Sequence, residues 1–462
     1  MTDSHFELTY GNSSRSFQIP AEKVNGRLVA PMRPDPLPGA IPEILKNALS
    51  EPLGCAPLSR MVEQKIVGIV VSDEFREGMQ REILDTLLDE VVKGTPQAII
   101  VLCATGTHPP GVYAKNASQW VAEARERLGV KIDFEAHDSE QSEFASVGKT
   151  SRGTELVFNS RLLESDVRIY GHESKHHYLN GYSCIDKQIL PGLSSGSTVA
   201  QNHKHALDPD SGPGRNPWHS SSARQKNPFS EDTREAREIS ERFVLSPGGK
   251  AVRGEVNTFA LDMVSAGQDI YWVRAGDPAA VTREMVSVVD DLMAFEVDRS
   301  RYVVVSPGGP PASQALYGTQ NAFDLALKGA IVPGGEALVL APLDGRPDLD
   351  PDVRGLAPDR RPKELFWDNL VRLLPKPLDE ARAEIAANFE LYLWKTDRVL
   401  RLLNGDGVKI YIHSQLPADV LAAGGFQSAP DIQAWIDERV ARDDGLFTVI
   451  DHGNKLCVTA RE

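Results

Sequence analysis

The sequence has few cysteines and no long apolar run, and both absences narrow the class of protein. Its 462 residues include only Cys55, Cys103, Cys184 and Cys457, which lack the close spacing of a metal site. Scattered cysteines of this kind are typical of reduced thiols in the cytoplasm. No apolar run reaches the length of a membrane span, and the polar start MTDSHFELTYG does not have the pattern of a signal peptide. We therefore expect a cytoplasmic protein with no membrane partner.

Basic residues are also in the minority. The chain has 65 acidic and 50 basic residues, which gives a formal net charge of −15. Such a charge argues against nucleic acid as a partner. An anionic small molecule would need a local cationic pocket. The length of 462 residues predicts two or three domains with substantial cores.

Short apolar runs alternate with helical patterns along the whole chain. Strands are predicted over residues 65–73, 98–104 and 166–170, and a second series begins near residue 301 and continues from residues 336 and 407. Helices are predicted over residues 79–92 and 378–403 and from Pro228. Buried strands that alternate with helices are typical of parallel sheets. The sequence thus predicts an α/β protein of two α/β domains with mostly parallel sheets, divided into residues 1–285 and 286–462.

Ligands of open α/β sheets bind beyond the carboxyl ends of the strands. Four segments follow predicted strands here, namely residues 73–76, 105–108, 171–205 and 306–309. We expect them to meet in one cleft between the domains.

Five of the eleven histidines fall within residues 171–205: His172, His176, His177, His203 and His205. Lys187 lies between the two groups of histidines. Histidine changes its charge near neutral pH and is the commonest metal ligand, so this loop-like segment indicates a working site. The roles of His172, His176 and His205 stay open at this point.

Several structural or chemical alternatives compete for these residues. Asp73 and Arg76 have the spacing of a helix cap with a surface ion pair. His203 and His205 could join His176 or His177 in a metal site, including that of a zinc-dependent hydrolase. Residues 192–196 (GLSSG) match the serine-hydrolase pattern G-x-S-x-G but lack the strand that normally precedes it.

Longer motifs resemble a known family. Residues 104–108 (ATGTH) are close to an A-T-G-T-H-R-P element. His177 precedes Lys187 by ten residues, an ILPG segment follows that lysine, and the Asn202-His203 pair ends sixteen residues after it. These motifs and intervals resemble those of the nickel-dependent lactate racemases, which racemise or epimerise α-hydroxy acids with a covalently attached nickel pincer nucleotide.

The resemblance implies a role for each matching residue. Lys187 would carry the cofactor, His203 would bind its nickel, and His108 and His177 would be the acid–base pair. Asp73 and Arg76 match an aspartate and an arginine of the family, so they would contact the cofactor, and Arg76 also the substrate carboxylate or a phosphate. The N-terminal domain would hold the cofactor, the C-terminal domain would close over the site with Tyr317, and separate biosynthetic proteins would supply the cofactor.

The departures from the family pattern concern residues that would face the substrate. Asn321 and Gly318 replace a lysine and a glutamine, His176 replaces a proline, and Lys175 precedes it. We therefore expect Lys175, His176, Tyr317 and Asn321 to contact a hydroxy acid larger or more polar than lactate. The alternatives are a lactate racemase proper, a metal-dependent hydrolase that uses the same histidines, or a ligand-binding protein without turnover. The oligomeric state stays open.

Overall fold

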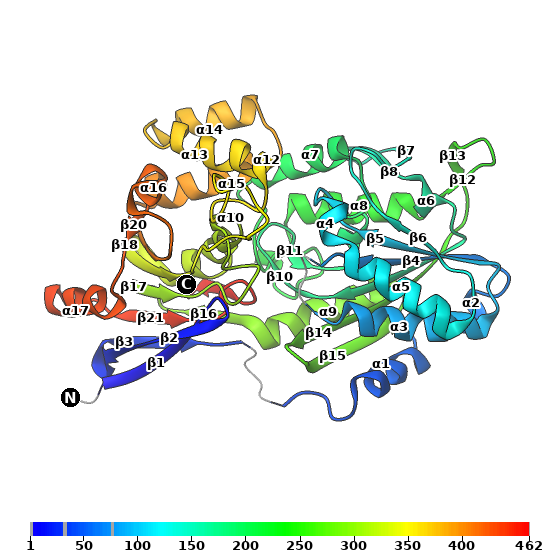
Figure 1. Ribbon diagram of the computed structural model, residues 1–462, viewed down its shortest axis with the longest axis horizontal. Helices are drawn as coiled ribbons and strands as arrows, with labels where there is room; N and C mark the ends of the chain where they lie inside the picture. The colour runs from blue at the N-terminus through cyan, green and yellow to red at the C-terminus, as the bar shows by residue number, and fades with distance from the viewer. Residues whose placement is uncertain (1–2, 31–34, 75–77, 462) are drawn as a thin grey trace.

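Two six-stranded sheets form the framework of the protein and lie side by side in Figure 1. A computed structural model describes residues 3–30, 35–74 and 78–461 of the chain. The first sheet contains, in spatial order, β15 (Asp269–Gly276), β14 (Asn257–Ala266), β9 (Val167–Glu173), β4 (Ile66–Ser72), β5 (Ala98–Ala104) and β6 (Asp133–Ala136). Its strands run parallel except for the antiparallel pair β14 and β15.

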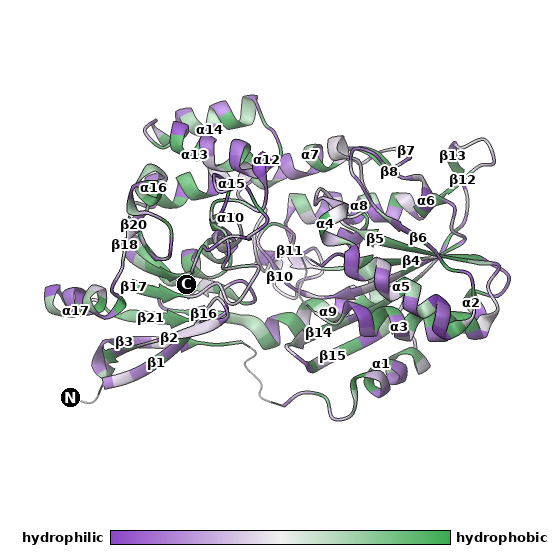
Figure 2. Cartoon of the chain, in the orientation of Figure 1, coloured by the Kyte–Doolittle hydropathy of each residue, from purple (hydrophilic) through white to green (hydrophobic). Residues whose placement is uncertain are grey.

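The second sheet is parallel throughout. It contains, in spatial order, β20 (Gln427–Ser428), β19 (Lys409–His413), β18 (Ile331–Leu340), β17 (Ser300–Val305), β21 (Phe447–Ile450) and β3 (Val24–Leu28). These two sheets confirm the predicted α/β class with mostly parallel strands. Figure 2 shows hydrophobic residues concentrated in the central strands of both sheets.

Alternate residues of the first sheet belong to two separate cores, because successive side chains of a strand point to opposite faces. Val67, Ile69 and Val71 of β4 pack with helices α1 (Ile41–Ser50), α3 (Gln80–Val91) and α5 (Lys115–Leu128). Val70 of β4 belongs to the core on the opposite face, with α8 (Pro228–Ser240) and α9 (Pro278–Met293). Helices therefore cover both faces, which explains why the strands are apolar without interruption.

The two faces of the second sheet have different covers. Val303 and Val305 of β17 pack against α10 (Leu316–Ala322), α13 (Asp368–Leu373), α14 (Leu378–Ala387) and α15 (Leu393–Leu400). Tyr302 and Val304 face the hairpin β1 (Asp3–Tyr10) and β2 (Ser13–Pro20), together with α17 (Ile432–Arg442). The start of the chain thus completes the core of its C-terminal half.

The N-terminal segment therefore pairs with the second sheet, a feature that the predicted division at residues 285 and 286 did not include. β3 forms the edge of that sheet beside β21. The predicted junction near residues 275–300 is mostly the helix α9. β16 (Ala294–Val297) follows it and pairs with β22 (Cys457–Ala460) at the end of the chain.

The remaining elements are short. They are the hairpins β7 (Phe144–Lys149) with β8 (Glu155–Asn159), β10 (Lys175–His177) with β11 (Gly181–Ser183), and β12 (Phe243–Leu245) with β13 (Ala251–Arg253), and the helices α2 (Leu58–Met61), α4 (Pro110–Tyr113), α6 (Ser160–Leu163), α7 (Gly196–Lys204), α11 (Lys328–Ala330), α12 (Arg360–Pro362) and α16 (Ala418–Ala423). The helix expected over residues 378–403 is two helices, α14 and α15, because residues 388–392 are not helical and Tyr392 has a φ of 81°. No helix within the described ranges has the length and apolar character needed to cross a membrane.

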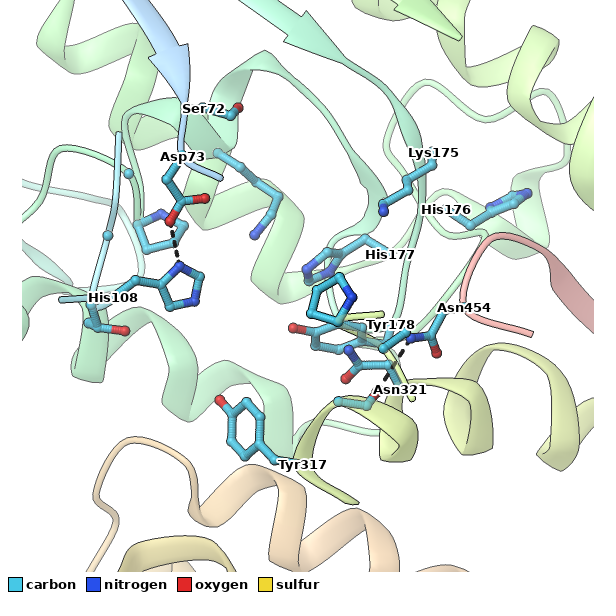
Figure 3. Close-up of a pocket in the computed structure, with 18 of the residues that line it drawn as sticks. Ser72, Asp73, His108, Lys175, His176, His177, Tyr178, Tyr317, Asn321 and Asn454 are labelled. Carbon is cyan, nitrogen blue, oxygen red and sulfur yellow. Dashed lines mark hydrogen bonds and ion pairs between the residues drawn. The ribbon is translucent and has the colours of Figure 1, made fainter. Parts of the chain in front are cut away.

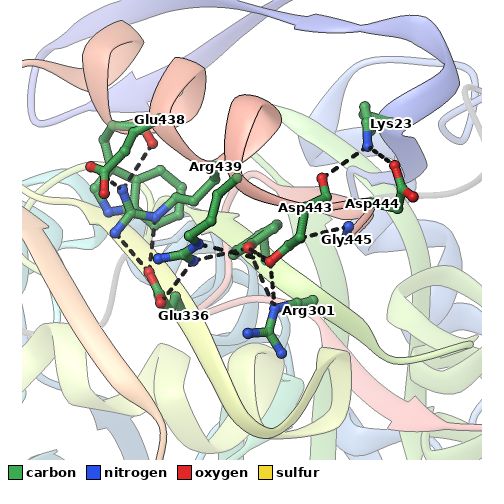
Figure 4. A network of polar contacts seen from close by, with 11 residues as sticks. Lys23, Arg301, Glu336, Glu438, Arg439, Asp443, Asp444 and Gly445 are labelled. Carbon is green, nitrogen blue, oxygen red and sulfur yellow. Dashed lines mark hydrogen bonds and ion pairs between the residues drawn. The ribbon is translucent and has the colours of Figure 1, made fainter.

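A buried ion pair joins α17 to the second sheet (Figure 4). Arg439 donates to Glu336 of β18 through Nε at 2.9 Å and through a terminal nitrogen at 2.7 Å. The two side chains are 2% and 5% exposed. Arg439 also lies over the ring of Trp435, 4.0 Å from its centroid. Two exposed side chains extend the pair: Glu438 contacts the guanidinium at 3.1 Å, and Arg442 contacts the Glu336 carboxylate at 2.9 Å.

We predict that Glu336→Gln lowers the free energy of unfolding by about 3 kcal/mol, because it leaves the buried Arg439 guanidinium with only the exposed Glu438 as a counter-charge. Urea unfolding followed by circular dichroism would measure the change. Lys131→Ala is the control, because it removes an ion pair to Asp133 in which both side chains are exposed, and it should change little. Equal effects of the two changes would contradict this account of the pair.

Candidate active site

The carboxyl ends of strands from both sheets lie around one pocket. Residues after β4, β5 and β9 line it from the first sheet, and residues after β17 and β21 line it from the second. The predicted site residues that line it are Asp73, His108, Lys175, His176, His177, Lys187, His203, Tyr317 and Asn321. Arg76 lies outside the described residues. The four strand-end segments expected to meet do so, as far as the structure describes them.

His108 and Asp73 form a hydrogen bond on one side of this pocket (Figure 3). The Nδ1 atom of His108 lies 2.6 Å from Oδ2 of Asp73, whose side chain is only 2% exposed. A carboxylate can only accept, so Nδ1–H of His108 donates and the lone pair of the ring lies on Nε2. The expected helix cap at Asp73 is thus replaced by a contact that orients a histidine.

His177 ends the first strand of the small hairpin β10–β11, and its backbone neighbours hold its ring. The backbone N–H groups of Leu179 and Asn180 donate to Nδ1 at 3.1 and 3.0 Å. The ring also stacks on Tyr178 with centroids 4.1 Å apart. The hairpin needs glycine at position 181, where φ is 75° and any Cβ would lie 1.8 Å from the Arg215 carbonyl oxygen.

Lys187 lies in the short 3-10 turn η3 (Ile185–Gln188) and is 5% exposed. Its neighbours fix this turn from both sides. Gln188 donates through Nε2 to the Gly171 carbonyl oxygen at 2.6 Å and to that of Val70 at 3.3 Å. Asp186 accepts a hydrogen bond from the buried guanidinium of Arg237. The lysine backbone is therefore anchored to the centre of the first sheet and to α8.

His203 lies in the last turn of α7, whose N-cap Ser195 accepts from the Thr198 backbone. Its Nδ1–H donates to the Val199 carbonyl oxygen at 2.9 Å, which leaves the lone pair on Nε2. Desolvation and the charge of Lys187 lower the pKa of His203 to about 3. A neutral imidazole with this tautomer is the form that binds a metal ion.

The second sheet contributes Tyr317 and Asn321 from α10, and with them a residue that the sequence analysis missed. Lys395 of α15 is fully buried, and its Nζ donates to the Tyr317 carbonyl oxygen at 2.7 Å and to Asn321 Oδ1 at 2.6 Å. Its ammonium also lies 4.2 Å from the Tyr317 ring centroid. Lysine has no acceptor, so it must face the oxygen of the Asn321 amide and leave Nδ2 of that amide for other contacts.

A signal for Lys395 is present in the sequence. At helical spacing it shares a face with the buried Val399 and Leu402, where a lysine is rarely found. Burial lowers its pKa well below the usual value for lysine.

Lys175 and His176 leave the hairpin β10–β11 in different directions. In Figure 3 the Lys175 side chain points toward the labelled pocket residues and the His176 ring points away from them. His176 is fully buried and lies 3.5 Å from Asp290. Burial lowers its pKa to about 4, against the opposing effect of Asp290.

The other histidines of the cluster have buried acidic neighbours. His172 lies 3.4 Å from Asp262, and His205 lies 3.7 Å from Asp232. Asp232 also accepts from the Asn202 amide at 2.9 Å and thereby holds the helix turn that carries His203.

The geometry does not support either hydrolase hypothesis, the serine hydrolase or the metal-dependent hydrolase. The Ser194 hydroxyl is fully buried and donates to the Ile189 carbonyl oxygen at 2.6 Å, so it is not presented as a nucleophile. Across the described part of the chain, no three histidine, cysteine or acidic side chains are arranged to hold a metal ion by themselves.

Known proteins match both the sequence and the fold. Residues 10–214 match the lactate racemase N-terminal domain. A lactate racemase of Thermoanaerobacterium thermosaccharolyticum is 25% identical over 342 residues, 73% of this chain and 74% of the relative. A lactate racemase of Lactiplantibacillus plantarum is 25% identical over 199 residues, 43% of this chain and 46% of the relative.

Two solved structures share the fold. The lactate racemase apoprotein of T. thermosaccharolyticum has a TM-score of 0.78 at 22% identity and covers 99% of this chain and 100% of its own. A Thermotoga maritima protein has a TM-score of 0.60 at 16% identity and covers 91% of this chain and 97% of its own. In fold and sequence the chain is thus similar to lactate racemases, which are isomerases that act on hydroxy acids. The lactate racemase N-terminal domain accounts for residues 10–214, and the likeness to a lactate racemase extends over 73% of the chain.

The burial of His176 predicts how the stability of the protein depends on pH. The unfolded chain protonates His176 near pH 6.5, whereas the folded protein keeps it neutral down to about pH 4, so stability falls as the pH falls through this window. His176→Phe should make the slope between pH 6.5 and 5 shallower by one proton, or about 1.4 kcal/mol per pH unit. Urea unfolding at several pH values would measure it. His5→Phe, at an exposed position of β1, is the control, and an unchanged slope in His176→Phe would contradict the assignment.

Proposed function

We propose that this protein inverts the configuration at C2 of an α-hydroxy acid, using a nickel pincer nucleotide attached to Lys187. One observation carries the proposal: Lys187, His203, His108 and His177 line a single pocket. The similarity to lactate racemases supports racemisation of hydroxy acids in general. The cofactor, the residue roles and the substrate are the parts that we propose.

The residues around Lys187 and His203 fit the cofactor. His203 offers a neutral ring whose Nε2 carries the lone pair, the form that binds nickel, and its pKa is lowered by desolvation and then by the charge of the nearby Lys187. Lys187 is buried beside the pocket on a firmly anchored turn, as a covalent attachment point requires. When bound, the cofactor supplies an acceptor for the hydride of the substrate's α-carbon. The protein's own residues bind and orient the acid and move the hydroxyl proton.

The charged residues that line the pocket favour an anionic ligand, although the protein as a whole is acidic. Lys175 and Lys455 line the pocket and keep their charge when the cofactor is attached to Lys187. Among its described lining residues Asp73 is the one carboxylate, and it is engaged with His108. Net positive charge in a pocket with few carboxylates favours a substrate carboxylate.

The substrate that we propose is larger or more polar than lactate. Asn321 presents an amide whose oxygen is already held by Lys395, so its Nδ2 can donate to an oxygen of the substrate. Asn454 and Lys175 add polar groups to the same pocket. Lactate itself is the second candidate, because both curated relatives are named lactate racemase.

The cellular setting follows from the cofactor. We propose that biosynthetic partner proteins deliver it in the cytoplasm, where the four unpaired cysteines would remain reduced.

Attachment of the cofactor to Lys187 can be tested by mass. After co-expression with proteins that make the pincer nucleotide, the intact protein should gain a covalent mass localised to Lys187 and bind nickel. Lys187→Ala should lose the adduct, whereas Lys204→Ala, at an exposed position of α7, should keep it. His203→Ala should keep the adduct and lose most of the nickel. An unmodified Lys187 with tightly bound zinc would instead favour a hydrolase.

The substrate class has its own test. In a panel of lactate, malate, glycerate and aldonates, the loaded protein should turn over a hydroxylated or dicarboxylic acid best. Asn321→Leu should lower kcat/KM for that acid about tenfold, the effect of losing one hydrogen bond to the substrate, and leave lactate turnover nearly unchanged. Turnover of lactate alone would contradict the proposed substrate.

A further inference from the structure

We infer that Lys395 determines which end of the Asn321 amide faces the pocket, and that it thereby selects substrates with a hydrogen-bond acceptor at that position. Lys395 is a positioning residue, because it is fully buried and is not among the described residues that line the pocket. The meaning for a substrate rests on the proposed function. The orientation of the amide rests on contacts within the protein and can be measured without any turnover.

Three hydrogen bonds account for every N–H group of the Lys395 ammonium. Its Nζ donates to the Tyr317 carbonyl oxygen at 2.7 Å, to Gln320 Oε1 at 3.1 Å and to Asn321 Oδ1 at 2.6 Å. A backbone carbonyl can only accept. Gln320 is fixed independently, because its Nε2 donates to Asp324 Oδ2 at 2.9 Å and its oxygen must then face the lysine. Of these three acceptors, Asn321 is the one whose orientation the lysine itself decides.

The charge on Lys395 sets the direction of that contact. An ammonium has three N–H groups and no lone pair, so it needs the oxygen of the Asn321 amide. A neutral amine would give its two N–H groups to the two fixed acceptors and turn its lone pair toward the amide nitrogen. The two charge states would thus present opposite ends of the amide to the pocket.

The surroundings of Lys395 are those of a cation. Its Nζ lies 4.2 Å from the ring centroid of Tyr317, 4.7 Å from that of Trp394 and 5.1 Å from that of Tyr178. The negative faces of aromatic rings stabilise an ammonium. Burial lowers the pKa of Lys395, and the carboxylate of Asp324 opposes this effect. Since each N–H group of the ammonium has an acceptor, the charged form is the one that these contacts satisfy.

The Asn321 amide brings the effect of this charge into the pocket. Asn321 is half-buried and lines the pocket, so its Nδ2 group remains as a donor there. A cation bound at the oxygen polarises the amide and strengthens its N–H groups as donors. The second sheet thereby presents positive charge to the pocket without exposing an ammonium. A 2-hydroxy acid with an acceptor oxygen in its side chain satisfies this donor, whereas the methyl group of lactate leaves it unpaired.

Neutron diffraction from crystals of the full-length protein in D2O tests the orientation directly. We expect three deuterons on Lys395 Nζ and both amide deuterons of Asn321 on the side of the pocket. Two deuterons on Nζ, or an Asn321 amide with its nitrogen toward Lys395, would overturn the inference. This measurement needs neither the cofactor nor a substrate.

A pair of isosteric acids tests the donor in the cofactor-loaded protein. The acid 2-hydroxy-3-methoxypropanoate has an acceptor oxygen where 2-hydroxypentanoate has a methylene group. The protein should favour the methoxy acid by about tenfold in kcat/KM, as for one hydrogen bond. Asn321→Asp keeps an oxygen toward Lys395 but replaces the N–H donor with a second oxygen, so it should remove or reverse this preference. No preference in the unaltered protein, or an unchanged one in Asn321→Asp, contradicts the inference.

Lys395→Met tests whether the lysine acts through that amide. Without the ammonium, Asn321 can turn its oxygen to the pocket, so the protein should admit an acid whose side chain only donates, such as 2-hydroxy-3-aminopropanoate with a protonated amino group. The kcat/KM of this acid relative to that of the methoxy acid should rise at least about tenfold.

A double-mutant cycle supplies the control for Lys395→Met. In the Asn321→Leu background the same change should leave the ratio of the two acids as it was. A similar rise in both backgrounds would mean that the lysine acts by its charge alone. No rise in either would mean that Asn321 is oriented without it, and both results count against the inference.

These tests separate the inference from the proposed function. If the loaded protein turns over no hydroxy acid, the proposed function fails, while the neutron structure still decides which end of the Asn321 amide faces the pocket. The neutron structure also decides the matter if Lys395→Met does not fold. If hydroxy acids are turned over without any distinction between the isosteric pair, the proposed function stands and this inference fails.

Discussion

The structure depends on one topological constraint: the carboxyl ends of two parallel sheets face the same pocket. Parallel strands place the loops that follow them at one edge, so each sheet delivers several polar loops to one place. The first sheet supplies His108, Lys187 and His203, and the second supplies Tyr317 and Asn321. Neither set forms a complete pocket by itself. The apolar cores that flank each sheet serve to keep these strand ends in position.

Within the pocket, each functional side chain is controlled by a neighbour that never needs to touch a substrate. Asp73 sets the tautomer of His108, backbone N–H groups set that of His177, and the Val199 carbonyl sets that of His203. Lys395 orients the Asn321 amide in the same manner. Hydrogen bonds of this kind determine which atom of a ring or an amide faces the pocket. Residue type alone leaves that choice open.

Much of the fold could be predicted from local patterns. The strands at residues 66–72 and 98–104 are continuous apolar runs, and both formed within a residue of the expected ends. The helix expected over residues 378–403 was interrupted, because Tyr392 takes a left-handed conformation that hydrophobic spacing does not reveal. The pairing of β3 with β21 joins residues more than 400 positions apart, and no local pattern predicts such a contact.

For the site, the sequence by itself determined which residues are available and how they are spaced: the histidine cluster around Lys187 and the motif at residues 104–108. These residues could be recognised as candidate site residues from the sequence, because they follow predicted strands. Only the tertiary structure decided their hydrogen-bond partners, including the Asp73 contact of His108 and the buried Lys395 behind Asn321. The physical reason is that a tautomer or an amide orientation depends on atoms from other parts of the chain, which only folding brings within 3 Å or so.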